Sequence, residues 1–433
     1  MCRIRLAALL LMGTTSLVGQ GLQDRDRALG RGMLQQIRKD IQKEYYDPSF
    51  GEIDLDTHFA QANEKLLQAA SVGQMLGIIA QALVDFNDSH TRFIPPGRVA
   101  RTEYGWQMQM IGDECLITAV KPKSEAEARG LKPGDRIAVL DGYQPTRESF
   151  KMIRYFYYAL RPQPGMRLTT VSPSGQSRQV DVPAKITEGF RVRDLTDEFE
   201  FWEYIRDLQN EGRKNRHTYL SLGEDGFIWK MPAFDLADRQ VESMMGRAKN
   251  REGFILDLRG NSGGYVKTLE TLGGYFFTEQ PVKIADLTGR KKMKPLMAKP
   301  KGGRAFTGKV VVLVDSETGS SAELFARVMQ IEERGMVIGD KTSGAVMQSR
   351  VHRHSSGVGR VVMYGANITN ADVIMSDGGR LERAGVIPDE LLIPSQEDLA
   401  AGRDPVLARA VNLIGYELSP EQAGEFFPIE WED

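Results

Sequence analysis

The chain has 433 residues, of which 41% are hydrophobic, and its acidic and basic residues nearly cancel to a formal net charge of -2. This balance argues against a nucleic-acid or polyanion partner, which would require a clear excess of basic residues. A chain of this length is expected to form two or three domains with substantial cores.

The first 21 residues have the pattern of a secretory signal. Arg3 and Arg5 form a short basic region, and residues 6–18 are apolar but too few to span a bilayer. We predict a signal peptide over residues 1–21 and an exported protein, periplasmic or extracellular, with no stable membrane span after its removal; a retained anchor is the alternative. Removal leaves one cysteine, Cys115, so no intrachain disulfide is expected.

Residues 22–98 read as an N-terminal helical domain. Met33, Ile37 and Ile41 recur on one helical face, and similar patterns follow to about residue 84. The unit closes at residues 88–93, just before a pair of prolines.

Residues 99–185 change to short strands with tight turns. Strands are expected over 105–108, 115–120 and 132–142, a helix near 149–160, and two further strands over 168–182. A small β domain of this size can bind an extended chain by adding it as an edge strand; the alternative is a module that only spaces its neighbours.

From residue 227 onward strands and helices alternate, which predicts a parallel sheet with crossover helices in a domain over 186–404. A tail over 405–433 carries one helix, 406–413. The expected strands are 227–230, 253–258, 309–314 and 336–338, and the expected helices are 236–248, 266–277 and 321–333.

A glycine-rich turn separates the strand 253–258 from the helix that begins at Val266. Gly260, Gly263 and Gly264 expose backbone N–H groups at the start of a helix, where they can hold a phosphate or the oxyanion of an acyl-transfer reaction. A phosphate site is disfavoured because no Gly-Lys-Ser/Thr ending is present.

Ser320 is the strongest candidate nucleophile. It lies just before the helix that starts at Ser321, where the helix dipole and the Ser321 N–H can stabilise negative charge. A helix N-cap is the alternative, and Glu323 fits a capping box. Ser320 is not flanked by the Gly-x-Ser-x-Gly pattern of a nucleophile elbow.

The five histidines are the candidate bases. His90 follows Ser89 at a helix-to-loop junction, and His352 and His354 would share one strand face without a third metal ligand nearby. No metal site and no cofactor are predicted. The remaining two, His58 and His217, lie among charged residues.

Six motifs occur in a fixed order along the chain. They are Asp88-Ser89-His90-Thr91, Gly130-Leu131-x-Pro133-Gly134-Asp135-x-Ile137, Asp257-Leu258-Arg259-Gly260-Asn261-x-Gly263-Gly264, Ser320-x-x-Glu323, Gly339-x-x-Thr342-x-Gly344 and Gly385-Val386-x-Pro388-Asp389. Together they resemble the S41 family of serine peptidases, which includes the carboxy-terminal processing proteases and the tricorn-core group. The resemblance implies an α/β, crotonase/ClpP-like catalytic domain, an N-terminal helical unit and an inserted PDZ-like β domain.

The sequence departs from the carboxy-terminal processing branch of that family. That branch uses a Ser–Lys dyad with the lysine in Thr-x-Gly-Lys-Gly, whereas Ala345 follows Thr342-Ser343-Gly344 here. Lys341 lies four residues upstream, about 13 Å along an extended backbone. A Ser320–Lys341 dyad remains an alternative.

The tricorn-like branch supplies a different base, and its residues match positions in this sequence. The resemblance implies that His90 takes the proton of Ser320 and that Ser89 or Glu382 orients the ring. Glu323 and Asp340 are rivals of Glu382. The implied oxyanion hole consists of Gly263 or Gly264 with Ser321.

The sequence therefore predicts an exported serine endopeptidase that acts on proteins or peptides. The PDZ-like domain would recruit unstructured C-terminal regions, with a carboxylate-binding loop formed by Gly105, Trp106, Gln107 and Met108. Because the dyad lysine is missing, a non-catalytic peptide-binding protein on the same fold is the alternative.

Overall fold

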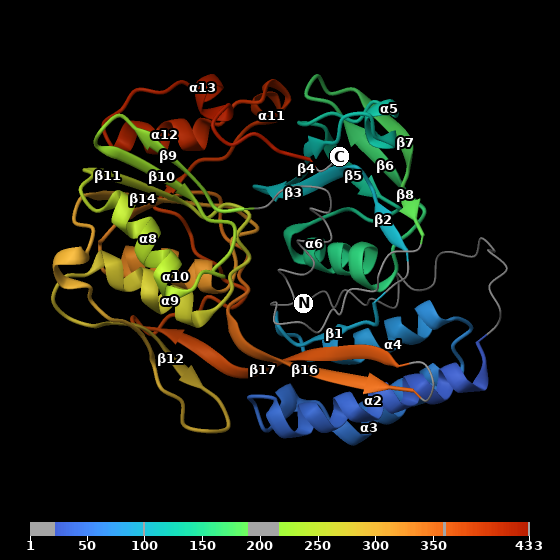
Figure 1. Ribbon diagram of the computed structural model, residues 1–433. Coiled ribbons are helices and arrows are strands. Elements are labelled where there is room, and N and C mark those ends of the chain that lie inside the picture. The colour runs from blue at the N-terminus through green and yellow to red at the C-terminus, as the bar shows by residue number, and fades with distance from the viewer. Residues whose placement is uncertain (1–21, 98–99, 189–215, 358–360, 432–433) are drawn as a thin grey trace.

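The computed structural model describes residues 22–97, 100–188, 216–357 and 361–431, so the predicted signal peptide lies outside the described residues (Figure 1). The described chain has a mixed α/β fold. None of its helices combines the length and apolar composition needed to cross a bilayer.

Three helices form the predicted N-terminal unit. α2 (Asp24–Glu44), α3 (Leu55–Leu67) and α4 (Val72–Val84) pack together, and the predicted face of α2 is buried. The side chains of Asp54 and Ser71 cap α3 and α4 by accepting backbone N–H groups. A short 3-10 helix, Phe50–Glu52, connects α2 with α3.

The small β domain is defined here as residues 101–187. Its five-stranded antiparallel sheet has the order β3-β4-β5-β6-β7, and β2 pairs with β8 beside it. Its helix α6 continues into a π-helical turn, so the predicted helix is two segments. The elements are β2 (Arg101–Glu103), β3 (Trp106–Ile111), β4 (Glu114–Val120), α5 (Glu125–Ala128), β5 (Arg136–Leu140), α6 (Arg147–Arg154), the π-helix Tyr155–Leu160, β6 (Gly165–Val171), β7 (Ser177–Pro183) and β8 (Lys185–Thr187).

The alternating region forms the predicted parallel sheet, with strand order β18-β15-β14-β11-β10-β9 and only β9 antiparallel to its neighbour. Its helices α8, α9 and α10 cover one face, and α12 and α13 cover the other (Figure 1). The strands are β9 (Thr218–Leu222), β10 (Gly226–Lys230), β11 (Gly253–Asp257), β14 (Lys309–Val314), β15 (Met336–Gly339) and β18 (Glu390–Leu391). The helices are α8 (Asp238–Ala248), α9 (Val266–Gly273) with the 3-10 turn Gly274–Phe276, α10 (Ser321–Ile331), α11 (Gln396–Ala401), α12 (Pro405–Leu413) and α13 (Pro420–Gly424).

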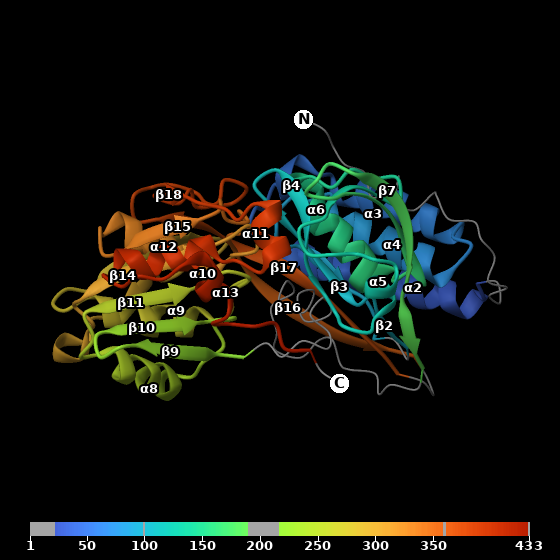
Figure 2. The same ribbon diagram turned by 90° about the horizontal axis from the view of Figure 1, so that it is seen from above.

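A further sheet, which the sequence analysis did not predict, joins the N-terminal helical unit to the domain that contains the parallel sheet. The long antiparallel ribbon of β16 (Met347–Ser356) and β17 (Val362–Met375) runs beside the N-terminal helices, as the views in Figures 1 and 2 show. At one end β17 pairs with β12 (Val282–Thr288), which pairs with β13 (Leu296–Ala298); the 3-10 turn Gly302–Arg304 follows. At the other end β17 pairs with β1 (Arg92–Ile94).

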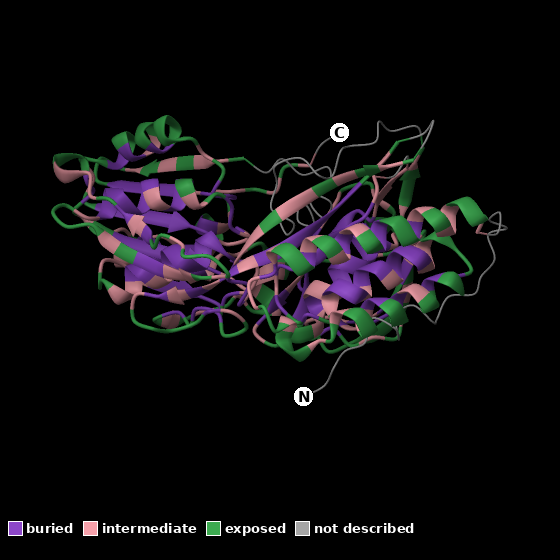
Figure 3. Cartoon of the chain, turned by 90° about the horizontal axis from the view of Figure 1, so that it is seen from below, coloured by how far each residue is buried: buried purple, intermediate pink, exposed green. Residues whose placement is uncertain are grey.

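The pairing of β1 with β17 positions the predicted base. Residues Arg92–Ile94 pair antiparallel with Gly365–Asn367. This pairing holds the preceding His90 in the interior, between the N-terminal helices and the domain that contains the parallel sheet. One continuous buried core then joins the N-terminal helices, the small β domain and β17, visible as buried ribbon in Figure 3. The early helical part is therefore packed against the later domain.

Candidate active site

Ser320 has a strained backbone conformation at the start of α10. Its φ of 52° and ψ of -123° lie in a region that non-glycine residues rarely adopt, and such strain costs about 1–3 kcal/mol and concentrates at functional sites. Ser320 is the N-cap residue of α10, and Glu323 makes its half of the predicted capping box, but the Ser320 side chain makes no capping hydrogen bond. The Ser320 N–H instead donates to the Ala345 carbonyl at 2.9 Å and to Glu323 Oε2 at 3.1 Å.

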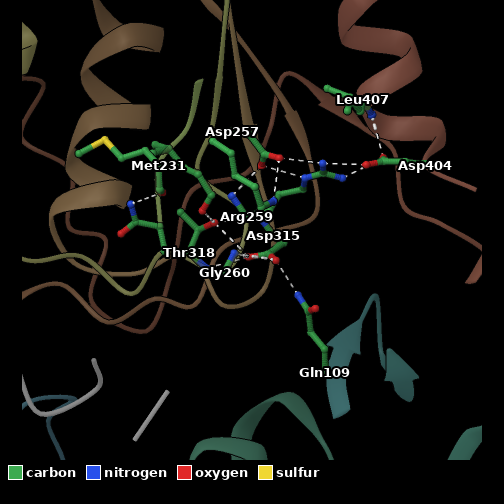
Figure 4. Close-up of polar contacts among 12 residues, drawn as sticks. Gln109, Met231, Asp257, Arg259, Gly260, Asp315, Thr318, Asp404 and Leu407 are labelled. Atoms are coloured by element: carbon green, nitrogen blue, oxygen red, sulfur yellow. Dashed lines mark hydrogen bonds and ion pairs between the residues drawn. The ribbon is translucent and has the colours of Figure 1, made fainter. Parts of the chain in front are cut away.

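Asp315 holds the turn that precedes Ser320. Its carboxylate accepts the Gly260 N–H at 3.0 Å and the Thr318 N–H at 2.9 Å, and Thr318 Oγ1 donates to the Leu258 carbonyl (Figure 4). The ends of strands β11 and β14 are thereby tied together. This arrangement supports the strained conformation of Ser320.

A buried ion network lies behind this turn. The Arg259 guanidinium bridges the carboxylates of Asp257 and Asp404, with N–O distances of 2.9 and 2.8 Å (Figure 4). Lys230 also contacts Asp257, at 3.0 Å. These cations overcome the effect of burial and hold the pKa of the Asp257 carboxyl well below its ordinary value.

The glycine turn packs directly against Ser320. A Cβ on Gly263 would lie 2.5 Å from the Cβ of Ser320, and a Cβ on Gly264 would lie 2.5 Å from the Phe234 carbonyl oxygen. Both glycines also have positive φ, 114° and 136°. A side chain at either position would therefore meet both a steric clash and backbone strain.

The hydrogen bonds of this turn show which of the predicted oxyanion-hole donors are available. The Gly263 N–H donates to Asn261 Oδ1 at 2.8 Å, so the assignment of Gly263 as an oxyanion donor is wrong for this arrangement. The N–H groups of Gly264 and Ser321 donate to no acceptor in the part of the chain that the structure describes. Of the three predicted donors, these two can receive a developing negative charge.

His90 is buried and has one ring nitrogen without a partner. Its Nδ1 lies 2.6 Å from Ser89 Oγ, and its buried Nε2 has no hydrogen-bond partner in the described chain. Ser89 Oγ in turn donates to Glu382 Oε2 at 2.7 Å. Because the Ser89 proton is used on Glu382, the ring must donate from Nδ1, which leaves the Nε2 lone pair as the acceptor.

Glu382 rather than its rivals contacts this pair. Its carboxylate also accepts the N–H groups of Ser89 and Val346, at 2.8 and 2.9 Å, and burial raises its pKa. Glu323 instead accepts the N–H groups of Gly344 and Ala345, and Asp340 accepts from Arg147 and Gly112.

Two adjacent residues connect Ser320 with His90. Ala345 accepts the Ser320 N–H through its carbonyl, and Val346 donates its N–H to Glu382. Glu382 then binds Ser89, which contacts the imidazole of His90. The structure therefore links the backbone of the predicted nucleophile to Glu382, Ser89 and His90 through this series of contacts, while no hydrogen bond joins His90 Nε2 to Ser320 Oγ within the described residues. Burial lowers the pKa of His90 to about 4, so its ring is neutral at pH 7.

The structure changes which lysine is relevant to the site. Lys341, the alternative dyad base, is exposed, while Ser320 is only 8% exposed, so the structure gives no support to a Ser320–Lys341 dyad. Lys151, which the sequence analysis missed, reaches from α6 to the Ser343 carbonyl at 3.0 Å, and burial lowers its pKa to about 8. No local motif marks Lys151, because only the docking of the small β domain brings it here.

The predicted carboxylate-binding loop is not a loop. Trp106, Gln107 and Met108 belong to strand β3, are buried, and pair with β4 around a bulge between residues 107 and 108. Alternating apolar residues favour burial over an exposed turn. Farther along β3, the Met110 carbonyl accepts from Ser316 Oγ, so part of the strand already contacts the peptide that leads to Ser320.

The two strand histidines take part in no metal cluster. His354 Nε2 lies 2.6 Å from Asp40 Oδ2 on α2. Within the described ranges, no group of three histidine, cysteine or acidic side chains is arranged to hold a metal ion.

The chain is similar to known peptidases. Residues 227–392 match the model of peptidase family S41. This part of the chain is similar to an S41 peptidase domain. That match, together with relatives named as proteases, supports a hydrolase of the serine peptidase type.

The proteins similar to this chain have low sequence identity to it. It is 24% identical over 424 residues to the putative tricorn protease homolog 2 of Streptomyces coelicolor, covering 88% of this chain but 33% of the relative. It is 26% identical to the carboxyl-terminal-processing protease of Synechocystis sp., covering 72% of this chain and 70% of that protein. The chain therefore spans about a third of the first of these relatives.

A solved structure shows the same fold. Mature CPAF superposes with a TM-score of 0.63 at 13% identity, and the match covers 87% of this chain and 95% of that one. This likeness of fold extends well beyond residues 227–392.

Proposed function

We propose that the protein is a serine endopeptidase in which Ser320 is the nucleophile and His90 is the general base. The observation that carries this proposal is the free, buried Nε2 of His90, whose opposite nitrogen is held by Ser89 and Glu382. A neutral imidazole fixed in this tautomer can accept a hydroxyl proton.

The reaction follows from these placements. Ser320 Oγ attacks the scissile carbonyl carbon while its proton passes to His90 Nε2. The tetrahedral intermediate collapses as the imidazolium returns the proton to the leaving amine, which leaves an ester on Ser320. Water then attacks that ester with His90 again as the base, and the acid product departs.

The oxyanion is held by backbone donors. The N–H groups of Gly264 and Ser321 are the proposed pair, since the described chain offers neither of them an acceptor. Ser321 also lies at the start of α10, where the helix dipole favours negative charge. One such donor typically contributes about 100- to 1,000-fold to the turnover rate.

Extended protein segments are the proposed substrates. Relatives are named as carboxyl-terminal-processing proteases, and we propose that this chain cleaves unstructured C-terminal regions of proteins. The small β domain is the proposed recruiting module, in which the segment adds along the edge of β3 instead of binding a separate loop. Export of the protein, directed by residues 1–21, is part of the same proposal.

Replacing the nucleophile tests the proposal. Purified protein is incubated with a permanently unfolded protein, and cleavage is followed by mass spectrometry. Ser320→Ala should abolish cleavage, with Ser316→Ala as a control on the neighbouring turn. An unchanged rate in Ser320→Ala refutes the proposal. Substrate that is bound but never cut by the parent protein would favour the non-catalytic alternative, which the alanine at position 345 suggests.

A further inference from the structure

A lysine from the small β domain enters the proposed active site. Lys151 lies on α6, and its Nζ donates to the carbonyl of Ser343 at 3.0 Å. Ser343 is next to the nucleophile turn, since its Oγ lies only 3.0 Å from where a Cβ on Gly319 would be. The ammonium is thus delivered beside the residue that precedes Ser320.

The segment that Lys151 contacts sets the backbone of Ser320. The Ala345 carbonyl accepts the Ser320 N–H, and Glu323 accepts the N–H groups of both Gly344 and Ala345. Movement of the Ser343 carbonyl would pass directly into these bonds. The Lys151–Ser343 hydrogen bond thus connects α6, which lies outside residues 227–392, with the segment that binds the backbone of Ser320.

The charge of Lys151 also acts on the catalytic groups. Its ammonium is attracted by the buried carboxylates of Glu323 and Glu382, and it disfavours a proton on His90. The other charged groups that face His90 are Asp88, which favours the protonated ring, and Arg92, which opposes it. Arg154 on the same helix is paired with Glu317 at 2.5 Å.

We propose that Lys151 is a positioning residue of the peptidase, which anchors the Ser343–Ala345 segment against Ser320 and adds a positive charge to the site. This inference rests on the proposed function. The Ser343–Ala345 segment has Ala345 at the position where the carboxy-terminal processing branch has its dyad lysine. In this proposal the positive charge at the site comes from Lys151 on α6 instead. Lys151 acts through Ser343 and His90 and is not itself the base.

Three substitutions separate the effect of the Lys151 hydrogen bond from the effect of its charge. Lys151→Met removes the hydrogen bond and the charge, Lys151→Gln keeps a donor but removes the charge, and Lys151→Arg keeps the charge. Arg147→Met is the matched control, because Arg147 also reaches from α6 to the same segment but contacts Asp340 and the Lys341 carbonyl instead.

The first readout is the rate at which a fluorophosphonate labels Ser320 between pH 4 and 9. Lys151→Met should lower the maximal rate about tenfold or more and move the acid limb upward by about 0.5–1 pH unit. Lys151→Gln should show the same movement with a smaller loss of rate, and Lys151→Arg should keep the parent's acid limb. Parent-like rates and limbs in both uncharged variants would overturn the inference, as would an equal loss in Arg147→Met.

The second readout needs no activity and so separates this inference from the proposed function. The imidazole of His90, assigned by comparison with His90→Gln, is titrated by NMR in the parent, Lys151→Gln and Lys151→Arg proteins. The His90 pKa should rise in Lys151→Gln and stay unchanged in Lys151→Arg. Failure of the parent to label at Ser320 refutes the function, whereas an unmoved His90 titration in Lys151→Gln refutes the role of Lys151.

Discussion

Ser89 Oγ lies between the imidazole of His90 and the carboxylate of Glu382, 2.6 Å from Nδ1 and 2.7 Å from Oε2. Ser89 and Glu382 are 293 residues apart in sequence, and the pairing of β1 with β17 helps to place them together. Glu382→Gln should lower kcat by about 10- to 100-fold with little change in KM, because the ring loses its fixed tautomer rather than any contact with substrate.

Asp340→Asn is the control for that measurement. Asp340 is a buried carboxylate near the same segment but binds Arg147 and Gly112 instead of Ser89. Steady-state kinetics on one peptide compare the two variants. A kcat in Glu382→Gln equal to that of the parent would show that the carboxylate does not orient the ring.

The pH dependence should show a base of unusually low pKa. Burial lowers the pKa of His90 from 6.5 to about 4, so kcat/KM should persist well below pH 6.5 and fall as the pH approaches 4. The unfolded chain binds the proton more readily between these values, so the neutral ring contributes stability that is complete above about pH 6.5 and lost toward pH 4. Denaturant unfolding across this range should therefore show a weaker pH dependence in His90→Gln, and an identical dependence would contradict the assignment.

Gly263→Ala should inactivate the protein. Its new Cβ would lie 2.5 Å from the Cβ of Ser320 and would occupy a backbone with φ of 114°. We expect kcat/KM to fall by about 100-fold or more, because small displacements of a reacting group are costly. Gly246→Ala on α8 is the control, since nothing lies within 4 Å of its new Cβ, and a parent-like rate in Gly263→Ala would refute the close packing.

Arg259→Met should destabilise the fold. It would leave the fully buried Asp257 and its partner Asp404 without their shared guanidinium, and removing one member of a buried ionic pair costs about 3–5 kcal/mol. Chemical denaturation measures the loss. Arg167→Met removes an exposed partner of Asp181 and should leave the free energy of unfolding unchanged. Equal stability of Arg259→Met and the parent would contradict the network.

Local patterns predicted the parallel sheet and the N-terminal helices because apolar spacing directly reflects which faces are buried. The antiparallel pair of β16 and β17 was not predicted, since most residues of β16 are polar and only partly buried and so give no apolar pattern, and β17 joins β1 and β12 from far away in sequence. Residues 105–108 were predicted both as a short strand and as a carboxylate-binding loop, and Trp106, Gln107 and Met108 belong to strand β3.

For the candidate site, too, local sequence patterns identified some residues, and tertiary contacts determine the rest. Motifs brought His90 and Ser320 into consideration, but the tautomer of the ring depends on Ser89 and Glu382, whose pairing is tertiary. The turn at Ser320 adopts a strained conformation without the Gly-x-Ser-x-Gly sequence, because Asp315 and Gly263 hold it from other segments. Lys151 carried no signal at all, since only the packing of α6 brings it to Ser343.

The account depends on His90 activating Ser320, and labelling of His90→Ala by a fluorophosphonate tests this most directly. The rate of adduct formation on Ser320, read by intact mass, should fall about 100- to 10,000-fold in His90→Ala, while Lys341→Ala should label like the parent. Unchanged labelling of His90→Ala, or a comparable loss in Lys341→Ala, would contradict the central claim.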